Sequence, residues 1–162
     1  MKDASHGIEA PCKRWLFRLR PPGHAALLLA LALAAHYAWP AARVMVLQFH
    51  PGAWLAGIGG GSVAAWGILC FRRKGTNLVP GKPVLHFVSD GPFRFTRNPM
   101  YLGLLGAHLS FALGYGTLPF YLSLAATFAV LRTLYIPYEE ALMQRQYGAA
   151  YEDYRRRVRR WL

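Results

Sequence analysis

The stretch from Gly91 to Gly103, "GPFRFTRNPMYLG", gathers several residues that could bind a charged ligand. Arg94 and Arg97 carry positive charge, and Asn98 and Tyr101 can form hydrogen bonds. The stretch stands directly before a long apolar run, where charged side chains are costly. Because the Asn-Pro pair restricts the backbone, this polar and aromatic segment is typical of a site held at the rim of an apolar element.

A second set of polar residues lies near the C-terminus. Glu139 and Glu140 are adjacent acids at the end of an apolar run, and a solvated helix end would also explain them. The tail that follows carries an apolar and aromatic stripe at helical spacing, formed by Tyr147, Tyr151, Tyr154, Val158 and Trp161. This stripe predicts an amphipathic helix, which could serve as a membrane-surface anchor or could also close a site against the middle loop.

Four apolar runs must position these groups. The first begins at Ala25, and the others cover residues 53–71, 99–116 and 118–136. Each approaches the roughly 20 residues that a spanning helix needs, the third being the shortest. A signal peptide is a rival interpretation of the first run, but its apolar character continues past the expected cleavage point. The short link "GYGT" predicts that the third and fourth runs form a tight antiparallel hairpin.

The charge of the chain predicts its topology. The composition is 54% hydrophobic and 16% charged, yet the net charge is +12, which suits a membrane protein or a nucleic-acid binder. Basic residues fall in the N-terminal segment, in the loop 72–98 and in the tail, whereas Arg43 is the one basic residue in the other two connections. This pattern places both termini and the middle loop in the cytoplasm. Nucleic acid is therefore not an expected partner.

These observations predict an all-α fold, a polytopic membrane helical bundle of about four transmembrane helices plus a C-terminal amphipathic interfacial helix. Residues 1–22 form a basic cytoplasmic segment, and residues 23–162 form a single membrane domain. The compact size and the Ala- and Arg-rich composition favour a bacterial origin, and hence a multi-pass protein of the inner membrane.

Three other features need an interpretation. "GIGGGS" resembles a dinucleotide-binding loop, but it lies inside an apolar run, so Gly57 and Gly61 are expected to form a close helix contact instead. Arg132 either faces the glutamate pair or extends toward the nearby interface. Cys12 and Cys70 make no disulfide framework, and no metal-binding motif is present in the sequence.

The motifs together resemble a known family. "GTNLVPGKPVLHFVSDGPFRFTRNPMYLG", the later "EE" and "QYGAAYEDYRRRVRRW" are similar to the isoprenylcysteine carboxyl methyltransferases, which are related to the phospholipid methyltransferases. The resemblance covers roughly residues 72–162. It implies a single methyltransferase-like membrane domain that uses S-adenosylmethionine, releases S-adenosylhomocysteine and takes a lipophilic acceptor from the bilayer.

The resemblance also implies roles for individual residues. Donor-binding residues would be Arg97, Asn98, Pro99, Tyr101, Gly103, Glu139, Glu140, Tyr151 and Tyr154, with Arg97, Asn98 and Tyr101 closest to the chemistry and no metal. An arginine could pair with the donor carboxylate, a glutamate could accept its hydroxyl or amino hydrogens, and a tyrosine could face its sulfonium. Gly103 would allow the donor to approach the backbone.

One departure from the family bears on the acceptor. Many members have His where this chain has Asn98, and Asn cannot accept a proton near neutral pH. This favours an oxygen or sulfur acceptor over a protonated amine, unless His86 or His108 serves as the base. Carboxylate, thiol and amine acceptors stay open. The alternative functions are a membrane reductase that uses a nicotinamide cofactor and a non-catalytic membrane interaction protein.

Overall fold

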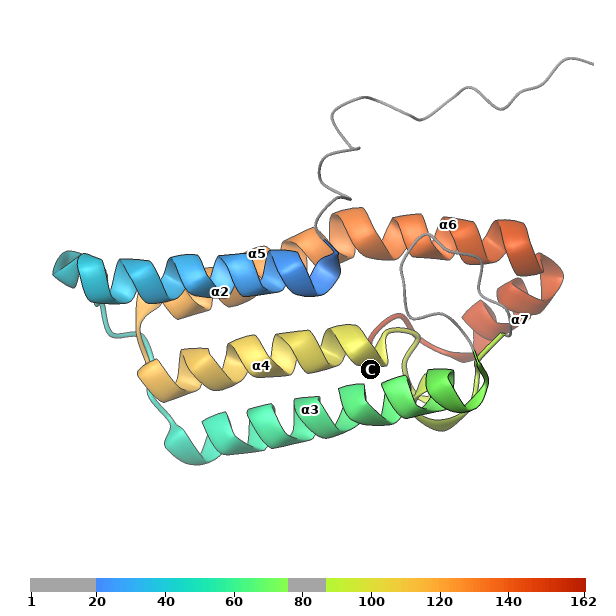
Figure 1. Cartoon of the computed structure of the whole chain (residues 1–162), viewed down its shortest axis with the longest axis horizontal. Helices are drawn as coiled ribbons and strands as arrows, with labels where there is room; N and C mark the ends of the chain where they lie inside the picture. The colour runs from blue at the N-terminus through green and yellow to red at the C-terminus, as the bar shows by residue number, and fades with distance from the viewer. Residues whose placement is uncertain (1–19, 76–86) are drawn as a thin grey trace, which may run out of the picture.

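The computed structural model describes residues 20–75 and 87–162, and these form an all-α bundle, which confirms the predicted fold class (Figure 1). Within the described part of the chain, β-pairing amounts to one isolated bridge between Met45 and Thr117. The α-helices are α2 (Pro21–Ala38), α3 (His50–Arg73), α4 (Pro99–Tyr115), α5 (Leu118–Val130), α6 (Ile136–Tyr147) and α7 (Ala149–Arg157). Single helical turns are η2 (Pro40–Ala42), η3 (Gly91–Arg94) and the π-helical turn Leu131–Tyr135.

The long helices lie side by side in two pairs. α3 packs against α4, α2 packs against α5, and α4 joins the pairs by packing against α5 (Figure 1). The hairpin predicted from "GYGT" is present, because α4 ends at Gly116 in the left-handed conformation and α5 begins at Leu118. The antiparallel course of this hairpin brings the start of α4 beside α6, which is what assembles the site described below.

Two helices are long and apolar enough to cross a membrane, judged by length and composition. They are α3, with 24 residues, and the continuous helix Leu118–Tyr147, with 30 residues. The predicted spans at α2 and α4 are helices of 18 and 17 residues, so the count of about four spans stays a prediction. The first apolar run does not stay helical to its end, because Pro40 follows the last residue of α2 closely and cannot continue the helix.

Glycines allow α3 and α4 to approach closely. A methyl group added at Gly103 would lie 2.4 Å from the Cβ of Ala64, and one added at Gly60 would lie 2.9 Å from the Cα of Gly106. Gly57 also faces α4, as predicted, but a methyl group at Gly61 would meet nothing within 4 Å. The predicted Gly57–Gly61 contact face is therefore wrong for Gly61. The three-residue step from Gly57 to Gly60 keeps both glycines on the α4 side of the helix.

The fourth run continues well beyond its predicted end at Ile136. Pro137 has no backbone N–H for the carbonyl four residues earlier, and the helix accommodates it through the π-helical turn Leu131–Tyr135, in which the Ile136 N–H bonds to the Leu131 carbonyl. Helix α6 then carries the chain on to Tyr147 without a break. Glu139 and Glu140 thus lie inside a helix and not at its end.

The C-terminal tail is helical, but it is not one helix. Gly148, with φ of 51°, adopts a conformation that favours glycine and separates α6 from α7. Helix α7 ends at Arg157, and Val158 is extended. The predicted stripe is divided as a result: Tyr147, Tyr151, Tyr154 and Val158 share one cluster, whereas Trp161 packs in the cluster that contains Tyr101.

Candidate functional site

The predicted polar residues meet at one end of the bundle, where the start of α4 lies beside α6. The Tyr101 hydroxyl donates a hydrogen bond of 2.5 Å to Oε1 of Glu139. Tyr101 is buried, and Glu139 is partly buried. A carboxylate that is partly shielded from water and held by a phenol has a fixed orientation, so these two groups form a rigid pair.

Glu140 is held between two arginines. Nη2 of Arg97 lies 3.2 Å from its Oε1, and Arg160 binds both of its oxygens, with Nε at 3.1 Å and Nη2 at 2.6 Å. The Arg97 and Glu140 side chains are only 11% and 13% exposed. The hydrogen bonds to Glu140 raise the pKa of Arg160, and the bidentate geometry of the pair fixes the relative orientation of the two side chains.

The C-terminal residues fix the loop before α4. The Arg97 amide donates to the Arg159 carbonyl at 3.0 Å, and the Asn98 side-chain amide donates to the Arg160 carbonyl at 2.8 Å. Thr96 also donates to the Arg160 carbonyl, at 3.3 Å. Sequence reasoning missed Thr96 and Arg160. The run of arginines in the tail indicates topological charge, and no spacing in the sequence distinguishes Arg160 from its neighbours.

The tyrosines of α7 close this end of the bundle. Tyr151 and Tyr154 are buried and pack with Phe87 from the middle loop. The Tyr154 hydroxyl donates to the Phe93 carbonyl at 2.8 Å. The aromatic face of α7 therefore contacts the middle loop, and a role for it in closing a site stays a prediction.

Burial also sets the ionisation of these tyrosines. Burial and the nearby Glu140 raise the pKa of Tyr151 to about 12, although Arg97 and Arg155 oppose the shift. Burial raises the pKa of Tyr154 further. Both side chains are neutral phenols at physiological pH, and they can donate hydrogen bonds.

Arg97 has unused hydrogen-bonding capacity. Its Nε and Nη1 atoms are buried, and neither has a hydrogen-bond partner in the part of the chain that the structure describes. Buried guanidinium N–H groups are costly when they are left unpaired. Two donors of this kind, next to Glu140 and Tyr151, are suited to binding an anionic group such as a carboxylate.

Other predicted residues have structural contacts that explain their identity. Gly103 faces Ala64 of α3, so helix packing accounts for the glycine, and Pro99 is fully buried at the first turn of α4. Their contact with a donor stays a prediction. Asn98 uses its side-chain amide on the tail, which gives it a role in positioning the loop.

The remaining candidates lie away from the cluster or outside the described residues. Arg132 is exposed, and its guanidinium carbon lies 5.8 Å from the centre of the Phe128 ring. His108 is buried, with its ring nitrogens 3.0 Å from the Leu104 carbonyl and 3.0 Å from the Thr127 hydroxyl. It is a packed and hydrogen-bonded residue. His86 lies outside the described residues.

A further polar pair, not anticipated from the sequence, adjoins the cluster. The Tyr135 hydroxyl lies 2.6 Å from Nδ1 of His24, and Tyr135 packs in the same group of buried residues as Tyr101. His24 comes from the first turn of α2 and Tyr135 from the π-helical turn. Sequence spacing could not reveal this contact, because the two residues are 111 positions apart.

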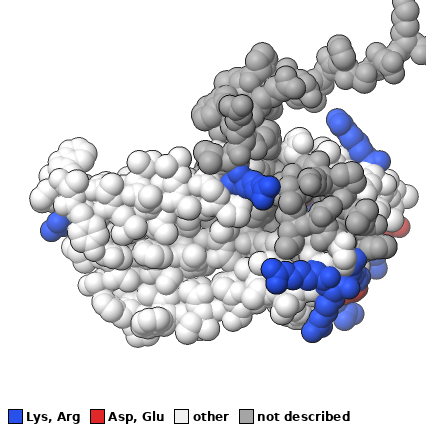
Figure 2. Space-filling view, in the orientation of Figure 1, with Lys and Arg blue, Asp and Glu red and all other residues white. Residues whose placement is uncertain are grey.

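Basic side chains surround this end of the molecule. Figure 2 shows that Lys and Arg gather around α7 and the adjacent end of α3, while most of the opposite end is uncharged. Lys74 at the end of α3 also forms an ion pair with Asp90 in the middle loop. The predicted clustering of positive charge on one side of the bundle is therefore present among the described residues.

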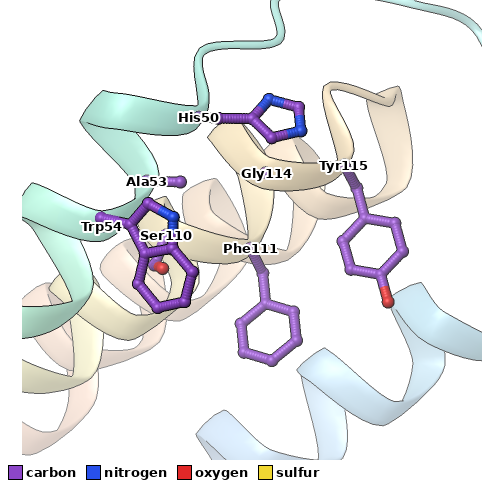
Figure 3. Close-up of a pocket in the computed structure, with 7 residues that line it drawn as sticks. All are labelled: His50, Ala53, Trp54, Ser110, Phe111, Gly114 and Tyr115. Atoms are coloured by element: carbon purple, nitrogen blue, oxygen red, sulfur yellow. The ribbon is translucent and has the colours of Figure 1, made fainter.

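A pocket of about 300 Å³ lies at the opposite end, well away from the arginine–glutamate cluster. Figure 3 shows His50, Ala53 and Trp54 from α3 and Ser110, Phe111, Gly114 and Tyr115 from α4 around it, with the Phe111 and Tyr115 rings directed toward α2. Aromatic and small side chains dominate its walls. Because its lining contains no Asp, Glu, Lys or Arg, we regard the arginine–glutamate cluster as the candidate site.

Comparison with known proteins adds one finding. The family model for phospholipid methyltransferases matches residues 47–150, well over half of the chain. The match runs from the connection before α3 to the first residues of α7, and so includes the Arg97–Gly103 segment and both glutamates. No curated protein and no solved structure matches the chain significantly.

Proposed function

Because the chain belongs to the phospholipid methyltransferase family, we propose that it is an integral-membrane enzyme that transfers a methyl group from S-adenosylmethionine to a lipophilic or small acceptor. The resemblance of its motifs to the isoprenylcysteine carboxyl methyltransferases supports the same chemistry. The acceptor atom is the oxygen of a carboxylate, the sulfur of a thiol or the nitrogen of an amine.

The observation that carries this proposal is the buried and unsatisfied guanidinium of Arg97. Nε and Nη1 of this side chain have no partner in the described residues, while its third nitrogen is engaged by Glu140. A carboxylate from the donor would satisfy both the charge and the hydrogen-bonding demand of this group. S-adenosylmethionine carries such a carboxylate and, when bound, supplies the methyl group from its sulfonium centre.

The surrounding residues have distinct tasks. Glu140 and Arg160 hold the Arg97 side chain in one position, and Tyr101 orients Glu139 so that its second oxygen can accept hydrogens from a ligand. Tyr151, a neutral phenol, offers a polar edge and an aromatic face beside Arg97. Prearranged groups of this kind favour methyl transfer through positioning, which contributes up to about 7–11 kcal/mol in ideal cases.

We also propose that the basic end of the bundle faces the cytoplasm, with both termini on that side and α2, α3, α4 and α5 crossing the membrane. The clustering of Lys and Arg around α7 supports this orientation. A soluble donor would then reach the Arg97 site from the cytoplasm, and a lipophilic acceptor would reach it from the bilayer.

Calorimetric titration of S-adenosylhomocysteine into the detergent-purified protein tests the proposal. We expect binding to the unchanged protein and a roughly tenfold to hundredfold loss of affinity in Arg97→Gln, which removes charge-assisted hydrogen bonds worth about 1.5–3 kcal/mol. Arg97→Lys keeps the charge but not the planar donor arrangement, so it should recover only part of the affinity.

Arg155→Gln is the matched control, because Arg155 lies on the exposed side of α7 in a surface ion pair. Its affinity should equal that of the unchanged protein. Absence of binding to the unchanged protein would overturn the proposal. Binding of NADPH in its place would then favour a reductase, and binding of neither ligand would favour a non-catalytic role.

A further inference from the structure

The connection between α2 and α3 crosses the tip of the α4–α5 hairpin and forms hydrogen bonds with the hairpin backbone. The Val46 amide donates to the Gly116 carbonyl at 2.8 Å, and the Phe49 amide donates to the Leu113 carbonyl at 2.9 Å. The Gln48 side chain donates to the Gly114 carbonyl at 2.9 Å. The last carbonyls of a helix normally depend on water or on a cap, and here a protein segment provides their partners.

The same segment also has partners for its own carbonyls. The Leu118 amide donates to the Val44 carbonyl at 2.8 Å, and the Tyr121 hydroxyl donates to the Leu47 carbonyl at 2.7 Å. Non-helical backbone is tolerated at membrane depth only where its polar groups are satisfied by protein or by a water-filled cavity. Protein provides partners for the Val44, Leu47 and Phe49 carbonyls and for the Val46 and Phe49 amides of this segment.

The apolar side chains of the segment are largely exposed. Those that are apolar and more than half exposed are Val44, Met45, Val46, Leu47 and Phe49. They continue the apolar surface of α3, where Trp54, Leu55 and Ile58 are likewise exposed. Such a contiguous apolar surface is unfavourable in water and typical of contact with lipid or protein.

Arg43, which precedes the segment, is hydrogen-bonded to the end of α2. Arg43 Nε donates to the His36 carbonyl at 2.7 Å, and its Nη2 donates to the Tyr37 carbonyl at 3.4 Å. Both carbonyls belong to the last turn of α2, where the helix dipole favours a cation. From Val44 to Phe49 no residue carries a charge.

The lengths of the helices indicate how deep the hairpin tip lies. Helix α4 has 17 residues and is therefore about 26 Å long, which is shorter than the roughly 30 Å hydrocarbon core. Helix α3, with 24 residues, is about 36 Å long and can cross the core fully. If α4 begins at the basic surface, its C-terminal end stops inside the apolar region of the opposite leaflet.

We propose that residues 44–49 form a lipid-immersed cap over the α4–α5 hairpin, in the leaflet opposite the Arg97 site, with their side chains among lipid acyl chains. This inference rests on the proposed membrane topology. Helix α4 is too short to cross the hydrocarbon core alone. The cap extends it, because protein groups in the cap, in place of water, donate hydrogen bonds to carbonyls at the end of α4. Acyl chains are the expected occupant because the cap is uncharged and continuous with the exposed apolar surface of α3.

The test uses spin labels on single cysteines in a variant whose natural cysteines are replaced by serine. The protein is reconstituted in vesicles of phosphatidylcholine and phosphatidylglycerol, and collisions are measured with oxygen, which concentrates in hydrocarbon, and with a water-soluble nickel chelate. Leu47→Cys reports on the cap, and Val46→Cys repeats the measurement at a second position. Ile58→Cys is the control for an exposed position on α3, and Ala150→Cys is the control for an exposed position on α7.

We expect the oxygen-to-chelate collision ratio at Leu47 and Val46 to match that at Ile58 and to exceed that at Ala150 several-fold. A ratio at both cap positions equal to that at Ala150, with Ile58 still in lipid, would overturn the cap and leave the proposed function standing. Low collision rates with both reagents would mean that protein, such as a second copy of the chain, covers the segment, and this too would overturn it. Chelate access at Ile58 as well would refute the membrane topology itself.

Discussion

Replacing Glu140 by glutamine should destabilise the protein far more than the same change at another glutamate of the C-terminal region. Glu140 is the shared acceptor for Arg97 and Arg160, and its side chain is only 13% exposed. Removing one partner of a buried ion pair costs about 3–5 kcal/mol, and the glutamine oxygen, which still accepts one hydrogen bond, recovers about 1 kcal/mol. The free energy of unfolding of Glu140→Gln should therefore fall by about 2–4 kcal/mol.

Glu152→Gln is the matched control. Glu152 pairs with Arg155 at 3.4 Å and with Arg156 at 4.0 Å, and all three side chains are at least 39% exposed. Surface pairs of this kind contribute about 0–1 kcal/mol, so Glu152→Gln should stay within that range. Denaturant unfolding in detergent micelles, followed by circular dichroism, measures both variants.

A double-mutant cycle assigns the effect to the predicted contact. If Glu140 acts mainly through Arg160, then Arg160→Gln alone should destabilise the protein. The double variant should then lose much less stability than the sum of the losses in the two single variants. The tail should also detach, because the ion pair between Arg160 and Glu140 holds it against α6, and limited proteolysis would detect that release. Equal unfolding free energies for Glu140→Gln and Glu152→Gln would refute the reasoning, since they would show that the buried network contributes no more than a surface pair.

Three further predictions follow from the packing and the topology. Gly103→Ala should lower the free energy of unfolding by about 1–3 kcal/mol, because its methyl group would lie 2.4 Å from the Cβ of Ala64. Gly59→Ala should raise it by about 0.5–1 kcal/mol, because a methyl group there meets nothing within 4 Å. Thermal unfolding compares the two variants, and equal losses of stability would contradict the argument that Gly103 contacts α3. Tyr154→Phe should cost about 1–3 kcal/mol in the same assay, because a buried carbonyl of the middle loop loses its donor, and an unchanged stability would mean that water replaces the hydroxyl. A cysteine at Ala150 should resist an impermeant maleimide added outside intact cells and react after lysis; efficient labelling from outside would reverse the orientation.

Much of the fold was accessible from the sequence because it depends on local properties. The apolar runs, the "GYGT" turn and the clustering of basic residues predicted an all-α bundle with its charges at one end, and these features are present. The family relationship was also predictable, since the "TRNPMYLG" segment and the glutamate pair are short motifs in a fixed order, and the family match includes both.

Element boundaries were less accessible where two local rules compete. Pro137 favours a helix break, yet a π-helical turn lets the helix continue to Tyr147, because packing of Leu131 and Tyr135 in the core outweighs the lost hydrogen bond. The aromatic stripe likewise predicts one helix across the tail, although the positive φ of Gly148 divides it.

The sequence by itself determined which residues are candidates for the chemistry, because charge, aromaticity and backbone restriction are properties of single side chains and short motifs. Only the tertiary structure decided how those residues are paired: Glu139 with Tyr101, Glu140 with two arginines, and His24 with Tyr135. It also decided that Gly103 faces α3 and that Arg160 returns to the start of α4. These contacts join residues 20 or more positions apart, so they depend on how the helices pack and on where the tail turns back, and no periodicity in the chain encodes that geometry.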